Sequence, residues 1–143
     1  MNIGSVSVVA PVYNEEDNID PFCDALFDVL EQLRLDYEVI LVNDGSTDGS
    51  LERLRSQAGR RRGLKVVSLR RNFGQTAALM AGIDHASKDV IVSIDADLQN
   101  DPRDIPRLLE KLAEGFDIVS GWRKDRQDSV GRSAFSRMAN RLI

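Results

Sequence analysis

Two aspartates directly after a short apolar run are the residues best suited to chemistry. The run Val90–Ile94 (V-I-V-S-I) predicts a buried strand, and Asp95 and Asp97 follow it at once. On an extended backbone, residues two apart point the same way, so both carboxylates can face one ion. Magnesium or manganese binds one or two such carboxylates together with water and phosphate oxygens, and would neutralise charge on a diphosphate leaving group. Gln99, two residues on, is placed to add an amide oxygen or to orient a metal-bound water.

Acidic residues also follow two other predicted strands. Glu15 comes after Ser5–Ala10, and Asp44 comes after Tyr37–Val42. In parallel α/β sheets ligands bind beyond the carboxyl ends of the strands, so these ends would bring the carboxylates to one edge. Any single one of them could instead cap a helix or fill a turn, as Asp48 could. The joint pattern of three acidic strand ends favours a binding site.

Short runs of β-branched residues alternate along the chain with longer stretches of helical periodicity. This alternation predicts an α/β fold, a mostly parallel sheet with helices on both faces. The predicted strands are Ser5–Ala10 (ended by Pro11), Tyr37–Val42, Lys65–Leu69, Val90–Ile94 and Asp117–Ser120. The predicted helices run from Ile19 to Leu33 (with Asn14 as cap), from the Asp44–Gly49 turn to near Gly59, and over Gln75–Ala86, Pro102–Glu114 and Val130–Leu142.

Length and composition indicate one globular domain over residues 1–143. Of the 143 residues, 42% are hydrophobic and 29% are charged, which excludes a disordered chain. A single cysteine, Cys23, and a single histidine, His85, exclude a disulfide framework and a cysteine-rich zinc site. Cys23 is expected in the core and His85 at the third helix. No apolar run has the length of a membrane span and no secretion signal begins the chain, so a cytoplasmic location is expected.

The formal net charge of −4 hides an asymmetry. Residues 122–143 carry six arginines and lysines against two aspartates, so an acidic body precedes a basic end. This distribution does not indicate a nucleic-acid binder, and it suits a metal site beside a phosphate-binding segment. The arginines could equally lie on the solvated face of an amphipathic helix.

Several other phosphate-binding and hydrolytic motifs are missing from the sequence. No G-x-x-x-x-G-K-[ST] loop occurs, which excludes a P-loop nucleotidase. The first strand is followed by Pro11 and Tyr13 rather than by G-x-G-x-x-G, which argues against dinucleotide binding. Neither G-x-S-x-G nor H-E-x-x-H is present.

Four segments in a fixed order resemble a known family. They are P-V-Y-N-E, V-N-D-G-S-T-D, R-N-F-G-Q-T-A-A-L-M-A-G and D-A-D-L-Q-N. They resemble the family-two, GT-A-type inverting glycosyltransferases, and among these the dolichyl- and undecaprenyl-phosphate sugar transferases related to dolichol-phosphate mannosyltransferase. The resemblance implies a GT-A (Rossmann-like) fold and transfer of a sugar from a UDP- or GDP-linked donor to a polyprenyl phosphate. It also implies a divalent metal, Mg²⁺ or Mn²⁺, and a single inverting displacement.

The resemblance implies roles for residues on the donor side. Asp44 would hold the base or the ribose, and Asp97 would take part in catalysis through the metal. The implied nucleotide-sugar-binding residues are Pro11, Tyr13, Glu15, Asp44 and Asp95, and the implied metal ligands are Asp95, Asp97 and Gln99.

On the acceptor side the resemblance implies phosphate-binding roles in the basic end. Arg123 in G-W-R would bind phosphate, and Arg132 and Ser136 in G-R-S-A-F-S-R-M-A-N would bind the acceptor phosphate, both arginines serving catalysis. A phosphate monoester, with a pKa of about 6, is already anionic near neutral pH. Its oxygen can therefore act as nucleophile without a histidine base, which fits a chain with one histidine.

Family members continue past the position where this chain ends, so the acceptor side is expected to be incomplete within residues 1–143. Membrane association is expected only through the lipid acceptor or through further sequence, at the inner face of the membrane. Three alternatives remain. The protein could be a family-two enzyme acting on a sugar hydroxyl in polysaccharide or cell-wall synthesis, or a nucleotide-sugar-binding module inactive on its own. It could also be a phosphatase with D-x-D at a strand end, although Leu98-Gln99 departs from that pattern.

Overall fold

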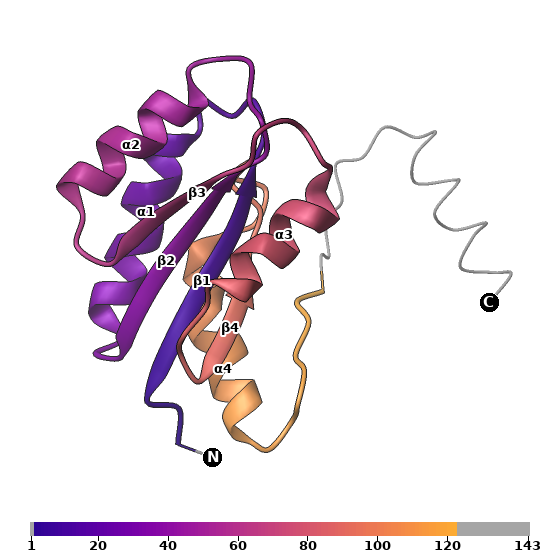
Figure 1. Cartoon of the computed structure of the whole chain (residues 1–143). Coiled ribbons are helices and arrows are strands. Elements are labelled where there is room, and N and C mark those ends of the chain that lie inside the picture. The colour runs from indigo at the N-terminus through magenta and orange to yellow at the C-terminus, as the bar shows by residue number, and fades with distance from the viewer. Residues whose placement is uncertain (1, 123–143) are drawn as a thin grey trace, which may run out of the picture.

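The structure, a computed structural model, describes residues 2–122. In this part of the chain four parallel strands form one sheet in the order β3-β2-β1-β4, with helices on both faces (Figure 1). The predicted α/β fold is therefore confirmed. In chain order the elements are β1 (Ser5–Val12), α1 (Ile19–Gln32), β2 (Asp36–Asn43), α2 (Ser50–Arg60), β3 (Leu64–Ser68), α3 (Gln75–Asp84), β4 (Val90–Ser93), a 3₁₀ turn η1 (Pro102–Asp104) and α4 (Ile105–Ala113).

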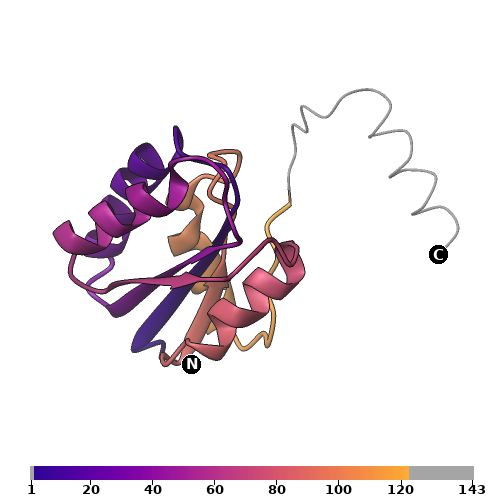
Figure 2. The ribbon, with the colours of Figure 1, turned by 45° about the horizontal axis from the view of Figure 1, so that its top comes forward.

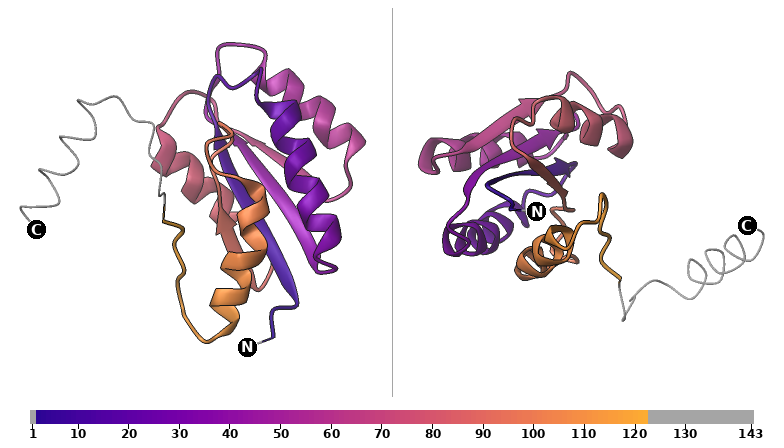
Figure 3. Two further views of the ribbon diagram at one scale, coloured as in Figure 1. Left: turned by 180° about the vertical axis from the view of Figure 1, so that it is seen from behind. Right: turned by 90° about the horizontal axis from the view of Figure 1, so that it is seen from below.

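Side-chain alternation along the two central strands creates a core on each side of the sheet. In β1, Val8 joins the core formed with α1, α2 and α4, whereas Val9 joins the core beneath α3. Figure 2 and the two views of Figure 3 show α1, α2 and α4 on one face and α3 on the other. Cys23 lies fully buried in the larger core, as predicted, and burial raises the pKa of its thiol to about 11. Because both faces of β1 and β2 are covered, these strands are almost continuously apolar.

The first strand extends one residue past Pro11, although the sequence predicted that this proline ends it. The Val9 carbonyl accepts a hydrogen bond from the Ile94 amide, so the backbone groups of Val9 point toward β4. Along a strand these groups point alternately to the two neighbouring strands, so those of Pro11, two residues later, also point toward the β4 side. The β1–β4 ladder stops at Val9, so the missing N–H of Pro11 costs no hydrogen bond. The strand therefore continues to Val12, paired with β2.

Two other sequence predictions are wrong. Asp117–Ser120 is not a strand, because no segment among residues 2–122 pairs with it; Ile118 is 86% exposed. Asn14 does not cap the first helix, because α1 begins at Ile19 with Asn18 at the cap position. The predicted helix Val130–Leu142 lies outside the described residues.

Within residues 2–122 no helix is long and apolar enough to cross a bilayer. His85 is the residue directly after α3, where its Nδ1 lies 2.7 Å from the Ala81 carbonyl oxygen, so it lies at the third helix as predicted.

A buried carboxylate ties the strands together at the amino-terminal end of the sheet. Glu38 of β2 accepts hydrogen bonds from Ser7 Oγ (2.6 Å), from Lys65 Nζ (2.6 Å) and from the Ser87 amide (2.7 Å). Burial alone would raise the pKa of the Glu38 carboxyl, but these donors outweigh it and lower the pKa to about 2. One side chain thus joins β1, β2, β3 and the segment before β4.

This network makes stability depend on pH. The pKa of Glu38 rises from about 2 in the fold to 4.5 on unfolding, so its contribution is complete above pH 4.5 and is lost as the pH falls toward 2. We expect Glu38→Gln to cost about 2 kcal/mol at pH 7 and to flatten the acid limb of the stability curve. Urea denaturation between pH 2 and 7 measures both effects. Glu110→Gln, at an exposed position in the middle of α4, should leave the curve unchanged.

Helix α3 sits so close to the sheet that it requires a glycine. A Cβ on Gly82 would overlap the Val9 side chain and lie 3.0 Å from Val42 Cγ2. We expect Gly82→Ala to lower the free energy of unfolding by about 1–3 kcal/mol, as overpacking does. In contrast, Gly59→Ala in α2 meets no atom within 4 Å and should stabilise the helix by about 0.5–1 kcal/mol. Equal effects of the two substitutions in urea denaturation would contradict this packing argument.

Candidate active site

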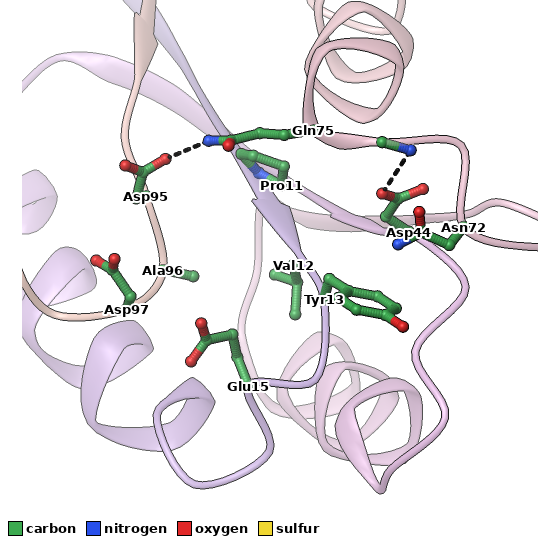
Figure 4. Close-up of a pocket in the computed structure, with 11 residues that line it drawn as sticks. Pro11, Val12, Tyr13, Glu15, Asp44, Asn72, Gln75, Asp95, Ala96 and Asp97 are labelled. Carbon is green, nitrogen blue, oxygen red and sulfur yellow. Dashed lines mark hydrogen bonds between the residues drawn. The ribbon is translucent and has the colours of Figure 1, made fainter. Parts of the chain in front are cut away.

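Four carboxylates from three strand ends line one pocket at the carboxyl-terminal edge of the sheet (Figure 4). Glu15 follows β1, Asp44 follows β2, and Asp95 and Asp97 follow β4, as the sequence predicted. The pocket has a volume of about 310 Å³. Its lining residues are Pro11, Val12, Tyr13, Glu15, Asp44, Asn72, Gly74, Gln75, Asp95, Ala96 and Asp97.

The segment after β4 presents two carboxylates that are held in different ways. Asp95 accepts hydrogen bonds from two side-chain amides, Gln75 Nε2 at 3.0 Å and Asn100 Nδ2 at 3.2 Å. Asp97 accepts one from the backbone amide of Gln99 at 3.0 Å, which closes a tight turn. Between the two aspartates, Ala96 is buried in the core and anchors the segment. Both carboxylates therefore remain half-buried at the pocket wall.

Asp44 organises the loop between β3 and α3. Its Oδ1 accepts from the Phe73 amide at 2.8 Å and its Oδ2 accepts from the Gly74 amide at 3.1 Å, and the residue is only 2% exposed. Gly45, with φ of 67°, lets the backbone of Arg71 and Asn72 pass directly over it. Since each carboxylate oxygen has two acceptor sites, Asp44 keeps acceptor capacity toward the pocket after serving this loop.

The loop after β1 is joined to the loop after β2. Asn14, with φ of 50°, accepts a hydrogen bond at its side-chain Oδ1 from the Thr47 backbone amide at 2.8 Å, and its backbone N–H donates to Ser46 Oγ at 3.0 Å. The Glu15 amide donates to Ser50 Oγ at 2.9 Å. These contacts explain why both segments, N-E after β1 and D-G-S-T after β2, are polar: their side chains hold the two loops together. Tyr13, which lines the pocket, directly precedes the residues that make these contacts.

Among the described lining residues the pocket has no lysine, arginine or histidine. Its four carboxylates make it strongly negative, although two backbone amides compensate Asp44. A bare phosphate would be repelled here, whereas a cation would be attracted. The pocket is therefore suited to bind an anion only when a cation binds with it and offsets the charge of the carboxylates.

The structure brings together most of the residues that the sequence singled out. Pro11, Tyr13, Glu15, Asp44, Asp95 and Asp97 all line the pocket, whereas Gln99 stands outside the lining. Arg123, Arg132 and Ser136 lie outside the described residues. Sequence reasoning gave no site role to Asn72, Gly74 and Gln75, although R-N-F-G-Q-T was one of the segments that carried the resemblance.

The family is decided by a sequence-model match over almost the whole chain. Residues 7–141 match the model described as glycosyl transferase family 2. The chain belongs to this family. The resemblance stated from the four segments is thereby confirmed.

Two curated family members illustrate the likeness. The chain is 46% identical over 143 residues to an undecaprenyl-phosphate 4-deoxy-4-formamido-L-arabinose transferase of Klebsiella pneumoniae, covering 99% of this chain and 43% of that protein. It is 46% identical over 140 residues to the enzyme of the same name from Edwardsiella ictaluri, covering 96% of this chain and 43% of that protein. The chain thus spans less than half the length of these relatives.

Solved structures confirm the GT-A glycosyltransferase fold. A mannosyltransferase from Pyrobaculum calidifontis, solved with GDP-Man and Mn²⁺, superposes with a TM-score of 0.65 at 27% identity over 77% of this chain and 32% of that one. TarS from S. aureus, solved with UDP, superposes with a TM-score of 0.60 at 21% identity over 85% of this chain and 40% of that one, and this likeness concerns the fold alone.

The contact between Gly45 and the loop above it can be tested directly. A Cβ on Gly45 would overlap the backbone of Arg71 and Asn72, so Gly45→Ala must displace the loop that Asp44 holds. We expect hydrogen exchange at the Phe73 and Gly74 amides to accelerate at least tenfold, the equivalent of about 1.4 kcal/mol of lost protection.

Gly115→Ala is the matched control. Gly115 also has a positive φ, 111°, but a Cβ there meets nothing within 4 Å, so the substitution carries the backbone strain alone. It should leave the two amides protected. Equal acceleration in both variants would show that the loop does not depend on the close approach at Gly45.

Proposed function

We propose that the protein transfers a sugar from a nucleotide-diphosphate donor to a polyprenyl phosphate, in an inverting displacement assisted by a divalent cation. The observation that carries the donor half is the clustering of four carboxylates in a pocket whose described lining has no basic side chain. Membership of glycosyl transferase family 2 supports the reaction class. The names of the relatives, which are undecaprenyl-phosphate transferases, support the acceptor class.

Asp95 and Asp97 fit a divalent cation of the Mg²⁺ or Mn²⁺ type. Within residues 2–122 no group of three or more His, Cys, Asp or Glu side chains is arranged to hold a metal by itself. A small hard cation needs only one or two carboxylates when substrate phosphates and water complete its shell. When bound, the ion would neutralise the negative charge of the donor diphosphate. The Mn²⁺ present in the related mannosyltransferase structure supports this proposal.

The remaining pocket residues would bind and orient the nucleoside. Tyr13, which is 46% exposed at the pocket edge, offers a flat ring for stacking, and Pro11 and Val12 provide an apolar wall. Asp44 offers the acceptor capacity that its loop contacts leave, for an N–H of the base or a hydroxyl of the ribose. Glu15 has one oxygen engaged with Asn18 Nδ2 at 2.7 Å, so its carboxylate is held at the wall.

The acceptor side would use the basic end of the chain. Arg123, Arg132 and Ser136 are proposed to bind the acceptor phosphate, with Gln99 as a further metal-facing residue. A phosphate oxygen is already anionic near neutral pH, so no residue of the chain has to remove a proton from the nucleophile. Catalysis would then depend on alignment of acceptor and donor and on charge stabilisation. A lipid acceptor would bring the reaction to a membrane surface, and we propose the cytoplasmic face.

Nucleotide titration tests the donor half of the proposal. We expect one of UDP, GDP and ADP to bind in calorimetry with Mn²⁺ present and to lose binding when a chelator replaces it. Asp97→Asn should weaken this binding at least tenfold because it removes a carboxylate from the cation. Asp84→Asn, at the exposed end of α3, should leave binding unchanged. Metal-independent binding, or an intact Asp97→Asn affinity, would contradict the cation role.

A transfer assay with the full-length protein tests the acceptor half. Label from the donor should appear in a lipid-extractable, acid-labile sugar phosphate when polyprenyl phosphate is supplied. Label on a sugar hydroxyl instead would assign the protein to polysaccharide synthesis. Metal-dependent nucleotide binding with no transfer to either acceptor would identify a binding module.

A further inference from the structure

Gln75 touches the carboxylate that we assign to the cation, from a different part of the fold. It is the first residue of α3, and its Nε2 donates to Asp95 Oδ1 at 3.0 Å. Figure 4 shows this side chain reaching across the pocket from the helix to the segment after β4. Gln75 is exposed, so its contact with Asp95 serves no packing purpose in the core.

The two oxygens of Asp95 are held from two sides. Gln75 serves Oδ1, and Asn100 serves Oδ2 at 3.2 Å. Two amide donors on opposite oxygens fix the rotation of a carboxylate about its terminal bond, which is otherwise broad. Each oxygen retains one further acceptor site, which can face a cation. Both donors are neutral, and among the described lining residues no cationic side chain competes with the ion.

The position of Gln75 is itself fixed by Asp44, the residue that follows β2. The two residues just before Gln75, Phe73 and Gly74, donate their amides to the Asp44 carboxylate at 2.8 and 3.1 Å. Because Gly45 has no side chain, the loop backbone at Arg71 and Asn72 can pack directly against it, next to the end of β2. A continuous chain of contacts therefore runs from the end of β2, through the start of α3, to the end of β4.

We propose that Gln75 is a positioning residue for Asp95: it orients the carboxylate toward the divalent cation that the donor diphosphate brings. This inference rests on the proposed function, because it assigns the cation to Asp95. Outer hydrogen-bond partners of metal ligands typically change metal affinity by roughly 10- to 100-fold when they are removed. The neutral amides of Gln75 and Asn100 share this role, so the lower end of that range is expected for Gln75 alone.

The test measures Mn²⁺ affinity rather than turnover. Gln75→Met keeps the length of the side chain and the helix propensity but removes the donor. In Mn²⁺ electron paramagnetic resonance titrations with UDP or GDP present, we expect the dissociation constant to rise about tenfold. The thermal midpoint should stay unchanged because the side chain is exposed. Thr76→Ala, at the next exposed position of the same helical turn, should leave the affinity unchanged.

A double-mutant cycle shows whether Gln75 acts through Asp95. If it does, Gln75→Met combined with Asp95→Asn should bind Mn²⁺ no more weakly than Asp95→Asn alone. Independent, additive losses would overturn the inference, as would a Gln75→Met affinity within twofold of wild type.

A comparison of Gln75→Met with Asp97→Asn separates this inference from the proposed function. Wild-type binding that is lost in Asp97→Asn but retained in Gln75→Met would leave the proposed function intact and remove only the role of Gln75. No nucleotide-dependent Mn²⁺ binding by the wild-type protein would overturn both.

Discussion

Parallel pairing of β1 with β2 on one side and β4 on the other is the constraint on which the rest of the structure depends. It sends three chain segments, far apart in sequence, to the same edge of the sheet. There the backbone leaves the ladder and its side chains become available for binding. Four like charges gathered at one edge would repel each other in the absence of compensation. Backbone and side-chain amides supply part of that compensation, and a bound cation would supply the rest.

The loops at this edge act as one assembly because each is held by another. Asn14 of the first loop binds the backbone of the second, and Asp44 at the end of β2 binds the backbone of the third. The third loop leads into Gln75, which reaches the fourth. Few of these contacts involve apolar burial, so polar side chains at the strand ends have a structural function beside any binding function. This double use explains why so many of them are concentrated in short segments.

Much of this arrangement could be predicted from the sequence, because hydrophobic periodicity and strand-end chemistry are local signals. Four of the five predicted strands, the buried Cys23 and the shared edge of Glu15, Asp44, Asp95 and Asp97 follow from such signals. The wrong strand predictions concern segments whose structure depends on a neighbouring strand rather than on their own residues. Pro11 is tolerated because β4 is shorter than β1, and Asp117–Ser120 is not a strand because no neighbour pairs with it. The contact between Gln75 and Asp95 joins residues twenty positions apart through a tertiary approach that no periodicity reveals.

The Glu38 network lies at the opposite end of the sheet from the pocket, and this separation has a consequence for how the scaffold can change. Its donors come from Ser7, Lys65 and Ser87, none of which lines the pocket. Substitutions far apart and without shared partners act nearly additively. Substitutions at the pocket can therefore change ligand preference while the Glu38 network continues to hold the strands in register. A substitution at the pocket therefore adds its own cost to the stability and leaves intact the contacts that hold the strands together at the other end.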